Sequence, residues 1–161
     1  MLETYEGGCH CGRVRLRVRG DLATVSECNC SVCTMKGILH LVVPREQFEL
    51  LQGEDAITTY EFNTGVAKHT FCRLCGIHAF YTPRSVPDGV SVNVRCLDGV
   101  DLAGLRPGLF DGRNWEATMR ARSHHTRLAQ TLHLVRRHAA QRGQHVRRVF
   151  AEQRRAADLR R

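Results

Sequence analysis

The sequence contains no long apolar segment. Nowhere along its 161 residues do roughly 18 apolar residues follow one another, which is about the length that a membrane-spanning helix requires. The first residues, Met1 to Glu6, offer neither a basic start nor an apolar run, so they lack the pattern of an export signal. These absences predict a cytoplasmic protein with no membrane partner, and the length suits one domain with a single core.

Acidic residues are scarce toward the C-terminal end. Residues 123–161 contain ten arginines but only two acidic residues, Glu152 and Asp158, whereas residues 1–122 contain 14 basic and 14 acidic residues. The whole net charge of +8 therefore belongs to residues 123–161. We expect the globular domain to end near Arg122 and a basic tail to follow it.

Apolar residues recur along this tail at roughly helical spacing, which predicts an amphipathic helix. They are Leu128, Leu132, Val135, Ala139, Val146 and Phe150. An apolar stripe of this kind ordinarily packs on its own domain or on another subunit. The arginines and histidines between these residues favour a second use, in which the tail recruits nucleic acid or an acidic protein surface.

Cysteine, by contrast, is abundant. Eight cysteines in a chain without an export signal argue against a disulfide framework, because a reducing cytosol keeps thiols free. Seven of them fall into three short groups: Cys9-His10-Cys11, Cys28-Asn29-Cys30-Ser31-Val32-Cys33 and Cys72-Arg73-Leu74-Cys75. Closely spaced thiols are typical of metal sites, so the sequence predicts metal ligation.

Most of the remaining sequence has the pattern of short strands. Arg13 to Arg19 alternates basic and apolar residues, which predicts a half-buried strand with Val14, Leu16 and Val18 inward and arginines on a solvated face. Further strands are expected at residues 24–27, 38–43, 48–51, 57–62, 68–71, 78–82 and 91–96, and a short helix at 114–120 with Asn114 as its cap. The fold class is therefore mainly β (α+β).

The first and third cysteine groups together supply four thiols, enough for a complete tetrahedral zinc site. On an extended segment, residues i and i+2 point to the same side, so Cys9 and Cys11 are expected to bind one ion. Cys75 is followed by Gly76, which permits the positive φ that such a turn often needs. An ion shared with Cys72 would cross-link distant strands and contribute to folding.

The second group has only three thiols, Cys28, Cys30 and Cys33. Three protein ligands with an open fourth position form the pattern of catalytic zinc, where water or a substrate sulfur can bind. Spacing alone does not assign each cysteine to a site. The open position could instead be closed by another side chain, namely Cys96, His10, His40, His69 or His78.

Isolated residues are expected to have ordinary structural roles. Cys96 follows an alternating apolar run and is expected to be a buried strand thiol. Lys68, Arg73 and Arg84 could hold the carboxylates of an acidic substrate, although exposed strand and turn charges are the more usual interpretation of such residues.

With these motifs in view, the chain resembles the glutathione-dependent formaldehyde-activating family, which includes the centromere protein V domain. The resemblance is carried by Gly7-Gly8-Cys9-His10-Cys11-Gly12, by the second cysteine group and by Phe71-Cys72-Arg73-Leu74-Cys75-Gly76. Shorter stretches similar to the centromere protein V branch are Thr59 to Thr64, Phe80 to Ser85, Cys96 to Asp98 and Asn114 to Glu116. The resemblance covers about residues 5–122 and not the tail.

This resemblance implies a small Mss4-like zinc-bound β domain of short antiparallel strands over residues 5–122, followed by the helical tail at 123–161. It implies two Zn²⁺ per chain, a structural one on Cys9, Cys11, Cys72 and Cys75 and a catalytic one on Cys28, Cys30 and Cys33. The implied activity is that of a zinc-dependent carbon–sulfur lyase, and its substrate is glutathione or a related thiol–carbonyl adduct such as S-hydroxymethylglutathione.

The residues also allow a second class of protein, a non-enzymatic zinc-stabilised binding module whose basic tail recruits nucleic acid or an acidic protein partner. Three thiolates give a zinc complex net negative charge and weaken its Lewis acidity, so catalysis would need nearby cations or amides. The two classes differ at the fourth position of the second site. An open position favours an enzyme, whereas a protein ligand such as Cys96 favours a scaffold.

Overall fold

The computed structural model describes residues 1–124, so the tail helix expected over residues 123–161 lies almost wholly outside the described residues. The chain forms two compact units, Met1–Trp115 and a second one that begins at Glu116. Residues 115–124 are helical, so the short helix expected at 114–120 is present and continues to the last described residue. Among residues 1–124, no helix is both long enough and apolar enough to cross a bilayer.

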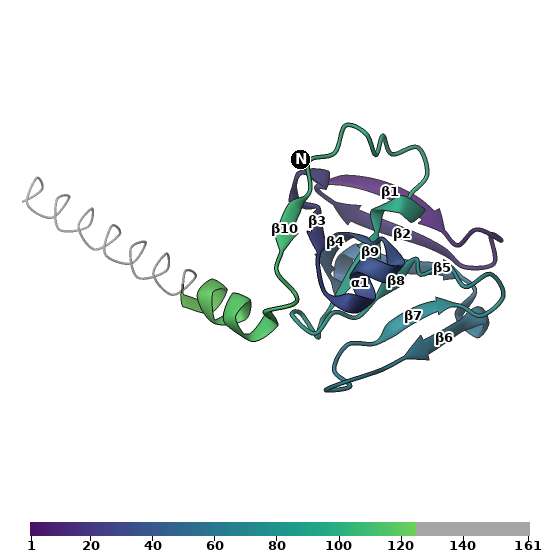
Figure 1. Ribbon diagram of the computed structural model, residues 1–161. Helices are drawn as coiled ribbons and strands as arrows, with labels where there is room; N and C mark the ends of the chain where they lie inside the picture. Colours follow the sequence, from purple (N-terminus) through teal and green to yellow (C-terminus); the bar gives the residue numbers. More distant parts are fainter. Residues whose placement is uncertain (125–161) are drawn as a thin grey trace, which may run out of the picture. The chain divides into compact units, whose positions relative to one another are not determined.

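Within residues 1–124, short strands form three small sheets (Figure 1). One sheet has the order β1-β2-β5, with bounds Glu3–Gly8, Arg15–Gly20 and Phe48–Gln52. The largest has the order β10-β3-β4-β9-β8, with bounds Gly108–Phe110, Ser26–Cys28, Leu39–Pro44, Gly89–Asn93 and Phe80–Tyr81. The third pairs β6, Ile57–Tyr60, with β7, His69–Cys72. The prediction of a mainly β fold is therefore confirmed.

Helical segments in the cysteine-bearing unit are short. The α-helix α1 spans Ser31–Lys36 and ends at Gly37, whose left-handed conformation closes the helix as a glycine C-cap. Four single turns of 3-10 helix join strands: η1 at Leu22–Thr24, η2 at Arg45–Gln47, η3 at Glu54–Ala56 and η4 at Val94–Cys96. Because α1 begins directly after Cys30, the helix is built into the second cysteine group.

The main core joins side chains from the first and second sheets. In β2 the predicted alternation is confirmed, since Leu16 and Val18 are fully buried while Arg17 between them is exposed. Arg17 forms ion pairs with the exposed carboxylates of Glu6 and Glu49, and such pairs add little stability. Every residue of β9 is buried, and Leu41 of β4 is fully buried beside it. Burial of these apolar side chains provides most of the folding free energy.

The expected strands overlap the observed ones, with differences at their ends. Residues 78–82 contribute only Phe80–Tyr81 to a strand, and residues 94–96 form η4 instead of extending β9. Two strands and the α-helix were not predicted, namely β1, β10 and α1. The strand β1 pairs with its neighbour β2, whereas β10 is only three residues long and runs parallel to the distant β3.

A substitution in β4 tests the position of the core. We expect Leu41→Ala to lower the free energy of unfolding by about 2–5 kcal/mol, because it leaves a cavity among fully buried side chains. Val42→Ala on the same strand is the control, since Val42 is 38% exposed and should lose less than about 1 kcal/mol. Urea unfolding followed by circular dichroism measures both, and equal losses would contradict the inward placement of Leu41.

Candidate metal centres

All eight cysteines are free thiols, and seven of them gather into two clusters. The four-thiol cluster consists of Cys9, Cys11, Cys72 and Cys75, and the three-thiol cluster consists of Cys28, Cys30 and Cys33. Within each cluster all Sγ atoms lie within 4.8 Å of one another. Both clusters could therefore hold a metal ion.

The four-thiol cluster has the spacing that a tetrahedral ion requires. The Sγ atom of Cys11 lies 3.5 Å from that of Cys9 and 3.7 Å from that of Cys72. Four thiolates at zinc–sulfur distances near 2.3 Å would be separated by about 3.8 Å. Both measured separations are close to that value, so this cluster could hold a zinc ion.

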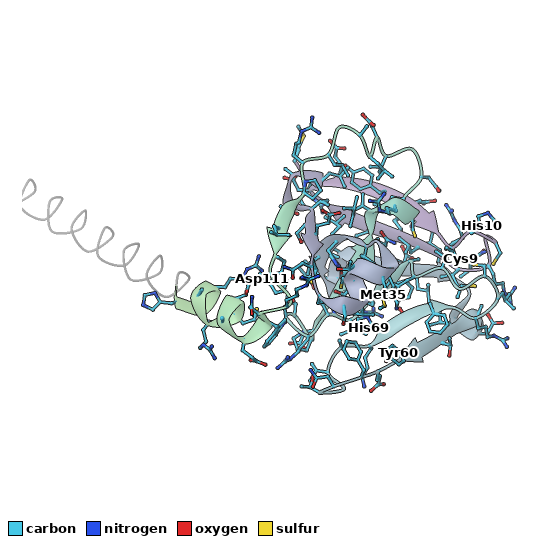
Figure 2. All side chains as sticks on the ribbon, in the orientation of Figure 1. Cys9, His10, Met35, Tyr60, His69 and Asp111 are labelled. Carbon is cyan, nitrogen blue, oxygen red and sulfur yellow. The ribbon has the colours of Figure 1, made fainter. Side chains whose placement is uncertain are left out.

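The turn that carries Cys9 and Cys11 differs from the expected extended segment. In Figure 2, Cys9 and His10 lie at the turn that joins β1 to β2. The amide of Gly12 donates to the Cys9 carbonyl, and the amide of Val14 donates to the Cys9 Sγ at 3.2 Å. The two thiols therefore converge because the chain turns, whereas the alternation of an extended strand was the wrong reason for expecting it.

The turn that carries Cys72 and Cys75 has the conformation that the sequence predicts. Gly76 has a φ of +76°, and its amide donates to the Cys72 carbonyl at 2.8 Å. Burial opposes ionisation of Cys75, but hydrogen bonds from the amides of Cys11 and Ile77 prevail and lower the pKa of Cys75 to about 6. Amides at this cluster therefore favour the thiolate form that a metal ligand needs.

The three-thiol cluster is assembled where β3 passes into α1. Cys28 ends β3, Cys30 immediately precedes the helix, and Cys33 lies within it. Hydrogen bonds from Cys28 and Cys33, together with the amides of Cys33 and Val32, hold the pKa of Cys30 far below its usual value. The hydrogen bond with Cys28 and burial raise the pKa of Cys33. Hydrogen bonds within the cluster therefore stabilise a thiolate among its three sulfur atoms.

Within residues 1–124, no further Cys, His, Asp or Glu joins the three-thiol cluster. Cys96 lies elsewhere, half-buried in η4, where its Sγ faces the His78 carbonyl at 3.8 Å. Burial and the nearby Cys9 and Cys75 raise the pKa of Cys96 to about 11. Cys96 is therefore a protonated thiol near the four-thiol cluster, in a 3-10 turn and not in a strand.

A segment that sequence reasoning missed, residues 108–113, lies against the three-thiol cluster. Its strand β10 pairs with β3, so that Phe110 is opposite Cys28. The side chain of Asn29 donates to Asp111 at 2.9 Å and accepts from the amide of Arg113 at 3.0 Å. A Cβ atom on Gly112 would lie 2.4 Å from the Cys28 Sγ. Only glycine fits at that position.

A cavity of about 480 Å³, which we call the thiol pocket, is lined by all three cysteines of this cluster. The lining also includes aromatic and cationic side chains: Phe62, His69, Tyr81, Arg84, Phe110, Arg113 and Trp115. The guanidinium carbon of Arg84 lies 3.6 Å from the centre of the Trp115 ring, which is cation–π geometry. A larger cavity of about 830 Å³ contains none of the three cysteines, so volume alone does not locate the chemistry.

The cations singled out in the sequence lie in different places. Arg84 lines the thiol pocket, whereas Lys68 forms an exposed ion pair with Glu61 at 2.6 Å and Arg73 lies outside the pocket. Arg113 lines the pocket and was missed, because nothing in its local sequence links it to the cysteines. Of the four histidines that could have closed the second site, His40, His69 and His78 are buried and His10 is exposed.

The fold and the two clusters define a small, mainly β, cysteine-rich domain with thiol sites of the metal-binding type. The chain belongs to the glutathione-dependent formaldehyde-activating enzyme family, which matches residues 4–110. The crystal structure of a Rhodobacter sphaeroides protein, a structural genomics target, is similar to it with 35% sequence identity and a TM-score of 0.61. That match covers 65% of this chain and 99% of the other. Family membership implies glutathione-dependent enzymatic activity of a general kind.

Gly112 offers a test of the geometry at the three-thiol cluster. We expect Gly112→Ala to lower the free energy of unfolding by about 1–3 kcal/mol, because the added methyl group overlaps the Cys28 sulfur. Gly108→Ala in the same segment is the control, since its added Cβ would meet nothing closer than 3.9 Å and should change stability by less than about 0.5 kcal/mol. Urea unfolding would refute the close packing if the two variants behaved alike.

Proposed function

We propose that the chain is a zinc-dependent carbon–sulfur lyase whose substrate is glutathione or a related thiol–carbonyl adduct, such as S-hydroxymethylglutathione. The observation that carries this proposal is the set of three thiols lining a pocket of about 480 Å³. This volume lies in the range of about 300–1,000 Å³ that small-molecule sites occupy. Membership of the formaldehyde-activating family supports both glutathione and formaldehyde as reactants.

The proposal includes two zinc ions per chain, because thiolate ligands select zinc among the common divalent cations. One ion would be structural, held by Cys9, Cys11, Cys72 and Cys75. The other would be held by Cys28, Cys30 and Cys33 and have a catalytic role. When bound at the second cluster, zinc supplies positive charge that favours the thiolate form of a substrate sulfur.

Cationic side chains of the pocket suit an acidic thiol. Glutathione carries two carboxylates at neutral pH, and Arg84 and Arg113 both line the pocket. The Trp115 ring holds the Arg84 guanidinium in place, and the Asn29 carbonyl accepts from the Arg113 Nε at 3.0 Å. Guanidinium groups fixed in this way lose little conformational freedom when they bind a carboxylate.

Aromatic residues provide the rest of the binding surface. Phe62, Tyr81, Phe110 and Trp115 line the pocket beside the thiols. Their rings would exclude water from the reacting sulfur and carbonyl carbon once a substrate is bound. Electrostatic interactions strengthen when water is excluded, so charges that develop on sulfur and oxygen would be stabilised more effectively.

Nearby groups also answer the objection that three thiolates leave excess negative charge. The amides of Val32 and Cys33 hydrogen-bond to Cys30. Burial lowers the pKa of Lys36, whereas its electrostatic interaction with the three-thiol cluster at Cys33 raises this pKa and favours the ammonium form. These amides and this cation partly offset the cluster's charge, which supports the catalytic role.

The eight free thiols support a cytoplasmic location, where thiols stay reduced.

The catalytic role of the three-thiol cluster is tested by Cys30→Ser. We expect this variant to bind one zinc ion fewer than the wild type and to lose more than about 100-fold in turnover of S-hydroxymethylglutathione, since even indirect partners of zinc ligands contribute 10–100-fold. Cys96→Ser is the matched control, because Cys96 lies outside both clusters and should keep zinc content and turnover. Equal turnover by Cys30→Ser and wild type, with one zinc lost, would exclude a catalytic cluster.

The structural role of the four-thiol cluster is tested separately by Cys75→Ser. We expect loss of the other zinc ion and a fall of several kcal/mol in the free energy of unfolding, because binding free energy at a structural site contributes directly to folding. Zinc content and urea unfolding are measured on the same reduced preparation. A variant that lost zinc but kept wild-type stability would show that this cluster does not hold the fold together.

A further inference from the structure

Four buried rings, two of which line the thiol pocket, form what we call the ring cluster: His40, His69, His78 and Tyr81. Each is less than 9% exposed. The ring centre of Tyr81 lies 5.0 Å from that of His69, 5.2 Å from that of His78 and 5.7 Å from that of His40. Tyr81 is thus the centre of a group that brings three histidines together from separate parts of the chain.

The ring cluster contains unpaired polar atoms. Among the described residues, Nε2 of His40, Nδ1 of His69 and Nε2 of His78 are buried and have no hydrogen-bond partner. A buried polar atom without a partner costs roughly 1–3 kcal/mol, and apolar side chains in the same space would avoid that cost. Three such atoms in one cluster therefore call for a functional explanation.

His69 differs from the other two histidines in its access to the thiols. It lines the thiol pocket, whereas His78 lines the larger cavity and His40 lines neither. The Nδ1 atom of His78 pairs with Lys36 at 3.0 Å, and that of His40 pairs with Ser91 at 3.1 Å. Within the described residues, His69 is therefore the histidine that can reach a substrate bound beside the three cysteines.

The orientation of His69 is fixed by its neighbours. Its side chain, labelled in Figure 2, is only 3% exposed. The rings of Tyr81 and Phe62 stack on it at 5.0 and 5.4 Å between centres, with interplanar angles of 10° and 26°. An imidazole stacked against two rings keeps one orientation, which is what proton transfer to a bound substrate requires.

The proposed reaction needs one group that can both accept and donate a proton. When a thiol adds to formaldehyde, the sulfur lone pair forms the carbon–sulfur bond and the π electron pair of the carbonyl moves to oxygen. The thiol proton ends on that oxygen, so no proton is gained or lost overall. Cleavage of the adduct reverses each movement. A single imidazole that reaches sulfur and oxygen can carry this proton in either direction.

We propose that His69 is a catalytic residue of the thiol pocket, where its imidazole takes the proton from the substrate thiol and delivers it to the carbonyl oxygen. This inference rests on the proposed function, because it assumes that a thiol and a carbonyl compound react beside the three-thiol cluster. Tyr81 and Phe62 then act as positioning residues that hold the imidazole.

The surroundings of His69 keep it neutral and able to accept a proton. Burial lowers the pKa of His69 below its ordinary value of 6.5, the ammonium of Lys36 lowers it further, and the charge of Cys30 opposes both effects. His78, His40 and Tyr81 also face the imidazole, and burial lowers the pKa of His78 to about 3 and that of His40 to about 4. Both therefore remain uncharged near neutral pH, where His69 is a free base.

The variant His69→Gln tests this role in the zinc-loaded protein. Glutamine keeps hydrogen-bonding capacity but cannot carry a proton, so we expect kcat/KM to fall by about 10²- to 10⁴-fold. Zinc content and the midpoint of urea unfolding should stay near wild type, and added imidazole should restore part of the rate.

The pH dependence of kcat/KM is a further test. In the wild type, kcat/KM should rise with pH through the His69 pKa, below 6.5, and this acid limb of the profile should be missing from the variant. His124→Gln, an exposed histidine of the second unit, is the control.

A second measurement does not depend on turnover. Glutathione binding is followed by calorimetry at one pH in two buffers that differ in ionisation enthalpy, which gives the number of protons released. The negative charge of a bound thiolate would raise the pKa of His69 in the complex, so that its imidazole keeps the thiol proton. We therefore expect almost no proton release from the wild type and about one proton from His69→Gln. Equal proton counts, or an unchanged acid limb in an active variant, would overturn the role of His69. If the wild type turns over no thiol–carbonyl adduct, the proposed function fails and the catalytic role of His69 fails with it, and the proton counts then show only whether His69 accepts the proton of a bound thiol.

Discussion

Four sulfur atoms within 4.8 Å of one another hold together two turns that are 61 residues apart in the chain. Thiolates at this spacing would repel one another strongly, so a cation bound between them would stabilise the folded arrangement. One turn joins β1 to β2 and the other follows β7, so the contact connects two sheets. The same β7 begins with His69 and ends with Cys72, which means that the four-thiol cluster also fixes one wall of the thiol pocket.

Local patterns in the sequence were enough to predict several features. The alternation around Leu16 and Val18 predicted an inward face, because one side of a strand must be buried when the other is charged. The positive φ of Gly76 followed from its place after Cys75. Thiol spacing predicted sites of the metal-binding type, and the resemblance that accompanied it correctly identified the family. Each of these inferences started from short motifs whose residues lie close together in the chain.

Features that depend on distant pairing could not be predicted in the same way. The helix α1 has only six residues and forms where β3 ends, so its sequence carries little helical signal of its own. Gly112 contacts Cys28 only because β10 pairs with β3. The three buried histidines follow no period, and they meet because β4, β7 and the segment before β8 converge on Tyr81. A burial pattern of this kind exists only in the folded chain.

The ring cluster bears on the choice between an enzyme and a zinc-stabilised binding module. A module in which both clusters were structural would gain stability if apolar side chains replaced the unpaired nitrogens of His40, His69 and His78. It would also have no use for a pocket beside the three-thiol cluster, where Arg84 and Arg113 gather. Unpaired buried polar groups in a native structure require an explanation, and a catalytic role is one such explanation. The ring cluster costs folding free energy and lies next to an accessible set of thiols. This arrangement is therefore easier to explain in an enzyme than in a scaffold.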